Sequence, residues 1–147
     1  GLSWITILKK RDNYRKAFHG FEIERVAGYT QNDVSRLLED PGIVRNRLKI
    51  ESAIKNAKGL VKIQEGFGSF DAFIWKYVDG VPRQNSWKRL SEIPPHTKDS
   101  DLMSRDLKRR GFTFVGSTIC YAFLQATGMV NDHTIDCFRY EEIKKIV

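Results

Sequence analysis

The sequence lacks the features of a disulfide-rich, membrane-spanning or secreted protein. It has only two cysteines, Cys120 and Cys137, and four prolines in 147 residues. Two such thiols could pair, but in an intracellular-looking chain they are more often reduced or metal-bound. The longest apolar run, around residues 119–124, is far shorter than the ~20 residues that span a bilayer, and no apolar stretch of signal-peptide type follows a charged start. We therefore expect a soluble, cytoplasmic protein without a membrane partner.

What the sequence does contain is enough apolar material for one folded domain. Hydrophobic residues make up 41% and aromatic residues 12%, whereas disordered chains are poor in both. The length suits a single domain, which we expect over residues 1–147. Residue 1 is Gly rather than Met, and a mostly apolar run follows at Leu2–Leu8, so we expect a chain that is cut or processed at its N-terminus.

Positive charge is in excess and is unevenly distributed. The formal net charge is +7, from 25 Lys and Arg against 18 Asp and Glu. Residues 9–16 carry +4 and residues 44–62 carry +5, whereas residues 131–147 carry −1. This distribution favours an anionic partner, and nucleic acid is the leading candidate, although many basic domains bind none.

The spacing of apolar residues predicts an all-α fold. Apolar residues recur at helical spacing along most of the chain, and alternation of the strand type is nearly absent. Proline and glycine punctuate the pattern, and residues 79–98, with three of the four prolines, should form a long irregular connection. Helices are expected after a capping segment at Thr30–Asp33, over residues 44–64, after Ser69, from Asp99 or Ser100 to Arg110, and over residues 117–127.

The most informative local pattern lies between the last two of these helices. Residues 108–118 read Lys-Arg-Arg-Gly-Phe-Thr-Phe-Val-Gly-Ser-Thr. Two glycines bracket a tight hairpin, and the N–H groups of Val115 to Thr118 would face outward at a helix N-terminus, where the helix dipole favours phosphate. The basic triplet before them supplies cations for phosphate neutralisation. The pattern predicts a helix-hairpin-helix that binds a DNA backbone. The alternative is an ordinary helix-helix turn with two core Phe residues.

His133 and Cys137 stand four residues apart near the C-terminus. On a helix, this spacing puts an imidazole and a thiolate on one face, within reach of a single ion, and zinc suits both ligand types. The pair supplies only half of a tetrahedral site, so the pattern alone is a weak indication of zinc. Cys120 lies in an apolar helix, where a buried and inert thiol is expected.

Other chemistry-bearing residues are less distinctive. Trp4 and Tyr14 could stack on a base near a DNA surface, although core packing is the alternative for both. No nucleotide-binding glycine-rich loop, Ser-His-Asp arrangement or paired-carboxylate motif stands out in the sequence. Glu92 and Asp132 are possible acids, but their spacing does not single them out. We therefore assign no catalytic group.

Three further stretches of the chain are distinctive. They are Gly-Leu-Ser-Trp-Ile-Thr-Ile-Leu-Lys-Lys-Arg at residues 1–11, Gly-Ile-Val-Arg-Asn-Arg-Leu-Lys-Ile at residues 42–50, and Arg-Gly-Phe-Thr-Phe-Val-Gly-Ser-Thr-Ile-Cys-Tyr at residues 110–121, followed by Val-Asn-Asp-His at residues 130–133. Together they resemble the bacterial 3-methyladenine DNA glycosylase I family. The resemblance implies an all-α, helix-hairpin-helix DNA glycosylase-like helical bundle. It also implies a monofunctional enzyme of base-excision repair, which hydrolyses the N-glycosidic bond of 3-methyladenine in alkylated double-stranded DNA after flipping the base out. The alternative is a non-catalytic helix-hairpin-helix DNA-binding module.

The resemblance also implies roles for individual residues. Trp4 would form the aromatic wall of the base pocket, and Leu2 would be the wedge that fills the gap left by the flipped nucleotide. His133 and Cys137 would be two ligands of a structural zinc ion in a monomeric protein. Family members carry further residues before the glycine that matches Gly1, and these hold the other two zinc ligands, several pocket aromatics and a glutamate that contacts the base. The residues that would contact the DNA backbone are Phe114, Val115, Gly116, Ser117 and Thr118.

Overall fold

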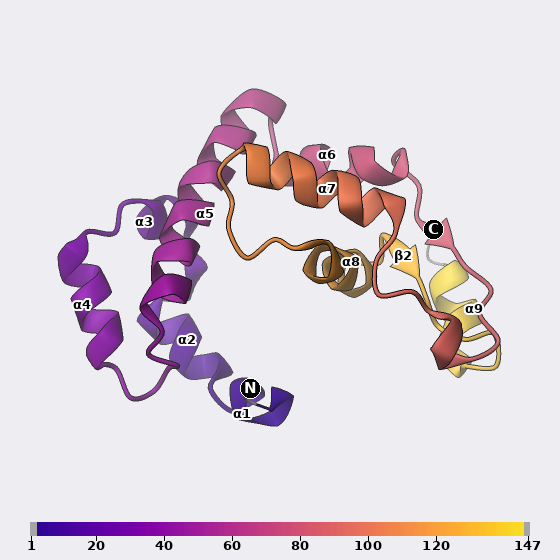
Figure 1. Cartoon of the computed structure of the whole chain (residues 1–147), viewed down its shortest axis with the longest axis horizontal. Helices are drawn as coiled ribbons and strands as arrows, with labels where there is room; N and C mark the ends of the chain where they lie inside the picture. Colours follow the sequence, from indigo (N-terminus) through magenta and orange to yellow (C-terminus); the bar gives the residue numbers. More distant parts are fainter. Residues whose placement is uncertain (1–2, 146–147) are drawn as a thin grey trace. The chain divides into compact units, whose positions relative to one another are not determined.

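The structure is a computed structural model that describes residues 3–145 (Figure 1). Its described part is mostly helical, which confirms the all-α prediction. The described part also contains a short pair of parallel strands, β1 (Arg83–Gln84) and β2 (Val130–Asn131). The chain divides into two compact units, Gly1–Gly66 with Gly111–Thr113, and Phe67–Arg110 with Phe114–Val147. A single glycosylase-like domain over residues 1–147 stays a prediction.

The first unit is built from the N-terminal helices. They are α1 (Trp4–Leu8), α2 (Arg11–Ala17), the 3-10 turn η1 (His19–Phe21), α3 (Ile23–Ala27), α4 (Gln31–Glu39) and the long α5 (Arg47–Phe67), of which all but the last residue belong to this unit. Their apolar faces meet in one core. Its buried members are Ala17, Phe18, Val26, Tyr29, Val34, Leu37, Ile43, Ile50 and Ile54.

Local capping residues set the bounds of α4 and α5. The Asp33 carboxylate accepts hydrogen bonds from the N–H and the hydroxyl of Thr30, which confirms the expected start of α4. Helix α5 begins and ends about three residues later than the predicted 44–64. It begins late because the Asn46 side chain accepts the N–H of Lys49 at 3.1 Å, and it runs on until Gly68 takes a positive φ of 79°.

The second unit contains α6 (Phe70–Trp75), η2 (Lys76–Val78), η3 (Leu90–Glu92), α7 (Lys98–Arg109), α8 (Ser117–Ala126) and α9 (Phe138–Lys144). Its fully buried apolar side chains include Phe73, Val78, Leu124 and Met129. Ser69 caps α6 by accepting the N–H of Ala72 at 2.9 Å, as the sequence predicts. The expected irregular connection is present between η2 and α7, and it carries β1 and η3.

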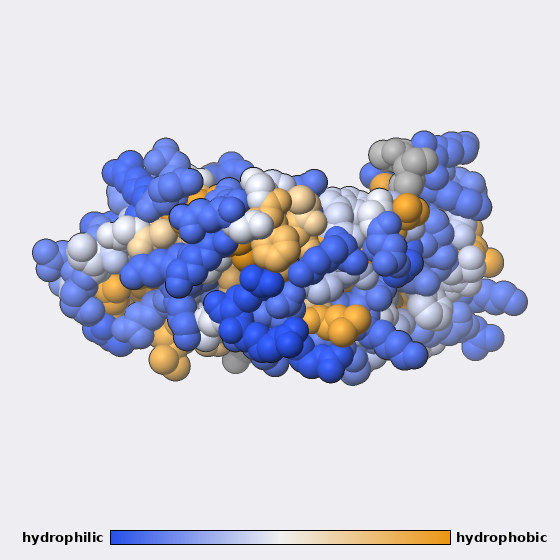
Figure 2. Space-filling view, turned by 90° about the horizontal axis from the view of Figure 1, so that it is seen from above, coloured by the Kyte–Doolittle hydropathy of each residue, from blue (hydrophilic) through white to orange (hydrophobic). Residues whose placement is uncertain are grey.

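The surface is mainly hydrophilic on the face that Figure 2 shows, where hydrophobic side chains gather only in small patches. Among residues 3–145, no helix combines the length and the apolar character needed to cross a membrane.

Candidate nucleic-acid interface

The predicted hairpin joins α7 to α8 (Figure 1). Gly111 has a φ of 87° and Phe114 a φ of 55°, so the loop turns through two left-handed residues, of which only one is glycine. The two hairpin phenylalanines differ, because Phe112 is buried while Phe114 is 53% exposed. The core-packing alternative therefore holds for Phe112 and not for Phe114.

Gly116 is the N-cap of α8, and its position bears on phosphate binding. Its φ of −63° is ordinary for any residue, and a Cβ built on it would meet nothing within 4 Å. Neither backbone strain nor internal packing therefore requires glycine here. The open space leaves room for a ligand to approach the first N–H groups of α8, which have no partner within the helix.

Buried serines of α7 hold the hairpin in the second unit. The Ser104 hydroxyl donates to the carbonyl of Val115 at 2.7 Å, and the Ser100 hydroxyl lies 3.2 Å from that of Ser117. Ser117 also donates to the carboxylate of Asp101, so a negative charge already lies beside the start of α8. Both α7 serines are buried. Sequence reasoning missed them, although polar residues on the apolar face of a helix were a usable signal.

The loop segment in the first unit is held separately. The side-chain amide of Asn56 on α5 makes two hydrogen bonds with Thr113, accepting from its N–H at 2.9 Å and donating to its carbonyl at 3.0 Å. The Thr113 hydroxyl donates to Ser52 at 2.8 Å. These contacts fix the backbone of Thr113 without using the exposed part of the hairpin. Neither α5 residue was predicted from the sequence to be part of the site.

Trp4 lies at the edge of a cavity of about 480 Å³ in the first unit. This size falls in the range of small-ligand pockets. Trp4 is 82% exposed, so it is not a core residue in the described chain. Tyr14 is half-buried and its hydroxyl accepts the N–H of Val44 at 3.1 Å, which fixes the ring in the wall. The lining residues are Trp4, Ile7, Tyr14, Val44, Asn46 and Lys49. Leu2, the predicted wedge, lies outside the described residues.

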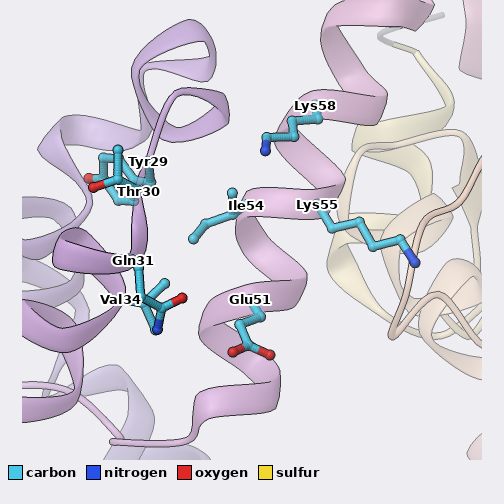
Figure 3. Close-up of a pocket in the computed structure, with 8 residues that line it drawn as sticks. All are labelled: Tyr29, Thr30, Gln31, Val34, Glu51, Ile54, Lys55 and Lys58. Atoms are coloured by element: carbon cyan, nitrogen blue, oxygen red, sulfur yellow. The ribbon is translucent and has the colours of Figure 1, made fainter.

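A second hollow of about 320 Å³ in the same unit contains none of the predicted site residues. Figure 3 shows residues around the start of α4 on one side and α5 on the other. Lys58 extends toward the hollow, whereas Lys55 points to the other side of α5. Its lining residues are Tyr29, Thr30, Gln31, Val34, Glu51, Ile54, Lys55 and Lys58.

His133 and Cys137 lie together in the second unit, but not on the helix assumed from their spacing. They flank a turn between β2 and α9, in which the N–H of Cys137 donates to the carbonyl of Thr134 at 2.9 Å. Their Nδ1 and Sγ atoms are 3.5 Å apart. Zinc bonds of ~2.0 Å to nitrogen and ~2.3 Å to sulfur at a tetrahedral angle give a ligand separation of ~3.5 Å. The pair therefore fits two ligands of one ion.

The rest of a metal site is not assembled in the described part of the chain. No group of three or more His, Cys, Asp or Glu residues that could hold a metal occurs within residues 3–145. Both cysteines are free thiols. Cys120 is buried, and burial raises the pKa of its thiol, as expected for an inert cysteine.

Asp132 is the centre of a polar cluster in the second unit. Its carboxylate accepts from Trp87 at 2.6 Å, from Asn85 at 2.7 Å and from Gln125 at 2.8 Å, and also from the Tyr121 hydroxyl. Burial alone would raise the pKa of Asp132, but these hydrogen bonds outweigh it and lower the pKa. Two of these donors lie in the irregular connection and two lie on α8, so the carboxylate links the two segments. It is therefore not free to act as an acid or a base.

Glu92, the other possible acid, is also held by a hydrogen bond within the protein. Its carboxylate accepts the N–H of Lys88 at 2.8 Å and stabilises the turn at η3. The residue is exposed and forms part of a loop cap. Neither candidate acid therefore has the geometry of a catalytic group.

The known proteins to which this chain is similar in sequence are methyladenine glycosylases. Residues 1–140 match the family model for methyladenine glycosylase. The chain is 49% identical over 140 residues to DNA-3-methyladenine glycosylase 1 of Escherichia coli K12, covering 95% of this chain and 75% of that protein. It is 43% identical over 137 residues to DNA-3-methyladenine glycosylase of Haemophilus influenzae, covering 93% of this chain and 74% of that protein.

The solved structures that superpose on this chain are also of 3-methyladenine DNA glycosylases. A crystal structure of a 3-methyladenine DNA glycosylase I superposes with a TM-score of 0.88 at 49% identity, covering 94% of this chain and 76% of that chain. A structure of the Staphylococcus aureus 3-methyladenine DNA glycosylase I, solved to explain 3-methyladenine recognition, gives a TM-score of 0.89 at 40% identity, covering 94% of this chain and 73% of that chain.

Proposed function

Because the chain belongs to the methyladenine glycosylase family, we propose that it removes 3-methyladenine from alkylated DNA by hydrolysing the N-glycosidic bond. The observation that carries the proposal is Trp4, an exposed aromatic ring at the edge of a cavity large enough for a small ligand. A base inside a duplex cannot reach such a cavity, so the nucleotide must be flipped out. An aromatic ring attracts a cationic base, and this attraction favours the alkylated base over an ordinary one.

The chemistry requires little from acidic or basic side chains. Alkylation at N3 makes the adenine cationic and turns it into a good leaving group, so the protein has to bind the flipped base and admit one water molecule. Of the described residues that line the cavity, none is a carboxylic acid or a histidine. Asp132 and Glu92 are occupied by structural hydrogen bonds. We therefore assign binding and positioning, and no general acid, to the described residues.

The DNA partner is proposed to be double-stranded and to be held by its backbone. The loop and first turn of α8 present Phe114, Val115, Gly116, Ser117 and Thr118, and the approach to Gly116 is open. Backbone N–H groups at a helix start bind phosphate without reading sequence. Lys108 and Arg109 end α7 next to this loop, Arg110 follows as the C-cap, and these basic residues supply positive charge. We further propose that the protein works as a monomer in the bacterial cytoplasm, where the DNA is.

The function is tested by chromatographic detection of free 3-methyladenine released from methylated duplex DNA. Trp4→Ala should lower the rate of release about 5- to 150-fold, because stacking on one base contributes ~1–3 kcal/mol, and Trp4→Phe should keep most of it. Duplex affinity should change less than release. If the unmodified chain releases no base above the spontaneous rate but still binds DNA, the non-catalytic DNA-binding module is the correct interpretation.

We also propose that His133 and Cys137 are two ligands of a structural zinc ion. The support is the 3.5 Å separation of Nδ1 and Sγ, which matches neighbouring ligands on one ion. Zinc would tie the turn between β2 and α9 to whatever groups complete its coordination. Cobalt in place of zinc gives a thiolate-to-metal absorption band, which Cys137→Ser should remove and Cys120→Ala, at the buried thiol, should retain. No band with the unmodified chain would contradict a metal site in this chain.

A further inference from the structure

Among the described residues that line the Trp4 cavity, Lys49 alone has a basic or acidic side chain of the Lys, Arg, His, Asp or Glu type. It lies in the first turn of α5, where its own N–H is held by the Asn46 side chain at 3.1 Å. Its side chain is exposed, and its ammonium group forms no ion pair with any residue from 3 to 145. By contrast, the neighbouring Arg47 is paired with Glu51 at 3.3 Å. Lys49 therefore presents an uncompensated positive charge to the cavity.

That charge does not suit the base itself. A base alkylated at N3 is a cation in DNA, and two positive charges a few ångströms apart repel each other. The base instead gains from the face of Trp4, through cation–π attraction. An ammonium group at the same cavity instead attracts a negatively charged part of the same ligand. In a flipped nucleotide, the nearest such group is a phosphate of the backbone.

We propose that Lys49 binds a backbone phosphate next to the flipped nucleotide and so positions the base against Trp4. The inference rests on the proposed function, because it requires a nucleotide to enter this cavity. In this arrangement, two side chains of the first unit contact different parts of the ligand. The Trp4 ring contacts the base, and the Lys49 ammonium group contacts the phosphate. Lys49 is then a positioning residue for the reaction and takes no part in bond cleavage.

The chain provides a matched control on the same helix. Lys58 is nine residues further along α5, and at ~3.6 residues per turn this places it on the opposite face of the helix from Lys49. It is exposed as well, forms no ion pair among the described residues, and extends toward the second hollow (Figure 3). Replacing either lysine removes one positive charge from α5, so only the position of the charge differs between the two variants.

The experiment compares Lys49→Gln with Lys58→Gln in binding to a duplex that contains a stable abasic-site analogue, over a range of salt concentrations. Lys49→Gln should weaken binding about three- to tenfold and lower the slope of log affinity against log salt by ~1, as expected for the loss of one phosphate contact. Lys49→Arg should restore most of the affinity. Lys58→Gln should change affinity less than twofold.

A second measurement separates phosphate from base. Binding of free 3-methyladenine, followed by Trp fluorescence or by NMR, should be unchanged in Lys49→Gln and lost in Trp4→Ala. Equal losses of duplex affinity in Lys49→Gln and Lys58→Gln would overturn the proposal in favour of diffuse attraction. Unchanged duplex affinity in Lys49→Gln, a parallel loss of free-base binding, or no abasic-duplex binding by the unmodified chain would overturn it too. The abasic duplex needs no cleavage, so a failure of base release alone contradicts only the enzymatic function.

Discussion

Gly59 shows how one residue limits the packing of the first unit. It is buried in α5, and a Cβ at this position would lie 2.5 Å from Cε2 and 2.9 Å from Cζ of the Phe112 ring. Close approach, rather than backbone freedom, therefore requires glycine. We expect Gly59→Val to lower the free energy of unfolding by ~1–3 kcal/mol, because the larger side chain overpacks the contact with Phe112. Urea unfolding followed by circular dichroism measures the change.

Gly66 is the control for this substitution. It lies in the same helix, but nothing is within 4 Å of the Cβ that a side chain would add. Gly66→Val should therefore stay within ~0.5 kcal/mol of the unmodified chain. Equal destabilisation by both variants would show that valine in the helix, and not the Phe112 ring, causes the loss. The sequence had no signal for this contact, because nothing in the spacing of Gly59 and Phe112 indicates that they meet.

At the scale of the secondary-structure elements, the α7 serines determine the shape of the hairpin. The Ser104 hydroxyl donates to the carbonyl of Val115 at 2.7 Å from a buried position. Ser104→Ala should lower the free energy of unfolding by ~1 kcal/mol, because the carbonyl loses a hydrogen-bond donor. It should also weaken duplex binding, because the loop that carries Gly116 is less rigidly held. Thermal unfolding and a DNA-binding titration test the two effects.

Ser91 provides the comparison for this variant. It is an exposed residue of η3 in the same unit, with no side-chain hydrogen bond among the described residues. Ser91→Ala should change neither the unfolding temperature nor DNA affinity. A Ser104→Ala protein with normal stability and normal affinity would mean that the hairpin does not depend on this hydrogen bond.

The secondary-structure elements were predictable where the chain carries its own start and stop signals. Thr30 and Ser69 mark helix starts, and Gly128, with a φ of 76°, follows the end of α8 as expected. Helix α9 was not anticipated. It has seven residues and begins at the turn that carries Cys137, and short helices depend on packing more than on local propensity. The same turn explains why the assumed helix for His133 and Cys137 was wrong while their proximity was right.

At the scale of the whole molecule, the site was predictable only in part. The hairpin is a local pattern, so residues 108–118 could be recognised from spacing alone. The Trp4 cavity collects residues from α1, α2, the connection before α5 and α5 itself, and periodicity does not say which helix faces meet. Family resemblance singled out Trp4, but no sequence pattern distinguished Lys49 from the other basic residues of α5. That distinction required the structure.

The pH dependence of global stability should have a component from Asp106. Its side chain is only 16% exposed and accepts from the Tyr77 hydroxyl at 2.7 Å, from Lys76 at 2.9 Å and from Arg110 at 3.1 Å. Burial alone would raise the pKa of Asp106, but the hydrogen bonds from Tyr77 and Lys76, with the charges of Lys76 and Arg110, outweigh it. They lower the pKa from its ordinary 3.8 to about 2.

A carboxyl whose pKa is lowered by folding stabilises the folded state only while it is ionised. The contribution of Asp106, ~1–2 kcal/mol, should be complete above about pH 4–5 and should disappear as the pH falls toward 2, because the unfolded chain takes up the proton first. Urea unfolding from pH 2 to pH 7 measures it. Asp106→Asn should flatten the acidic limb of the stability curve, whereas Glu65→Gln, at an exposed carboxylate without a side-chain hydrogen bond among the described residues, should keep that limb. An acidic limb that is equally steep with and without Asp106 would assign the acid sensitivity to other carboxylates.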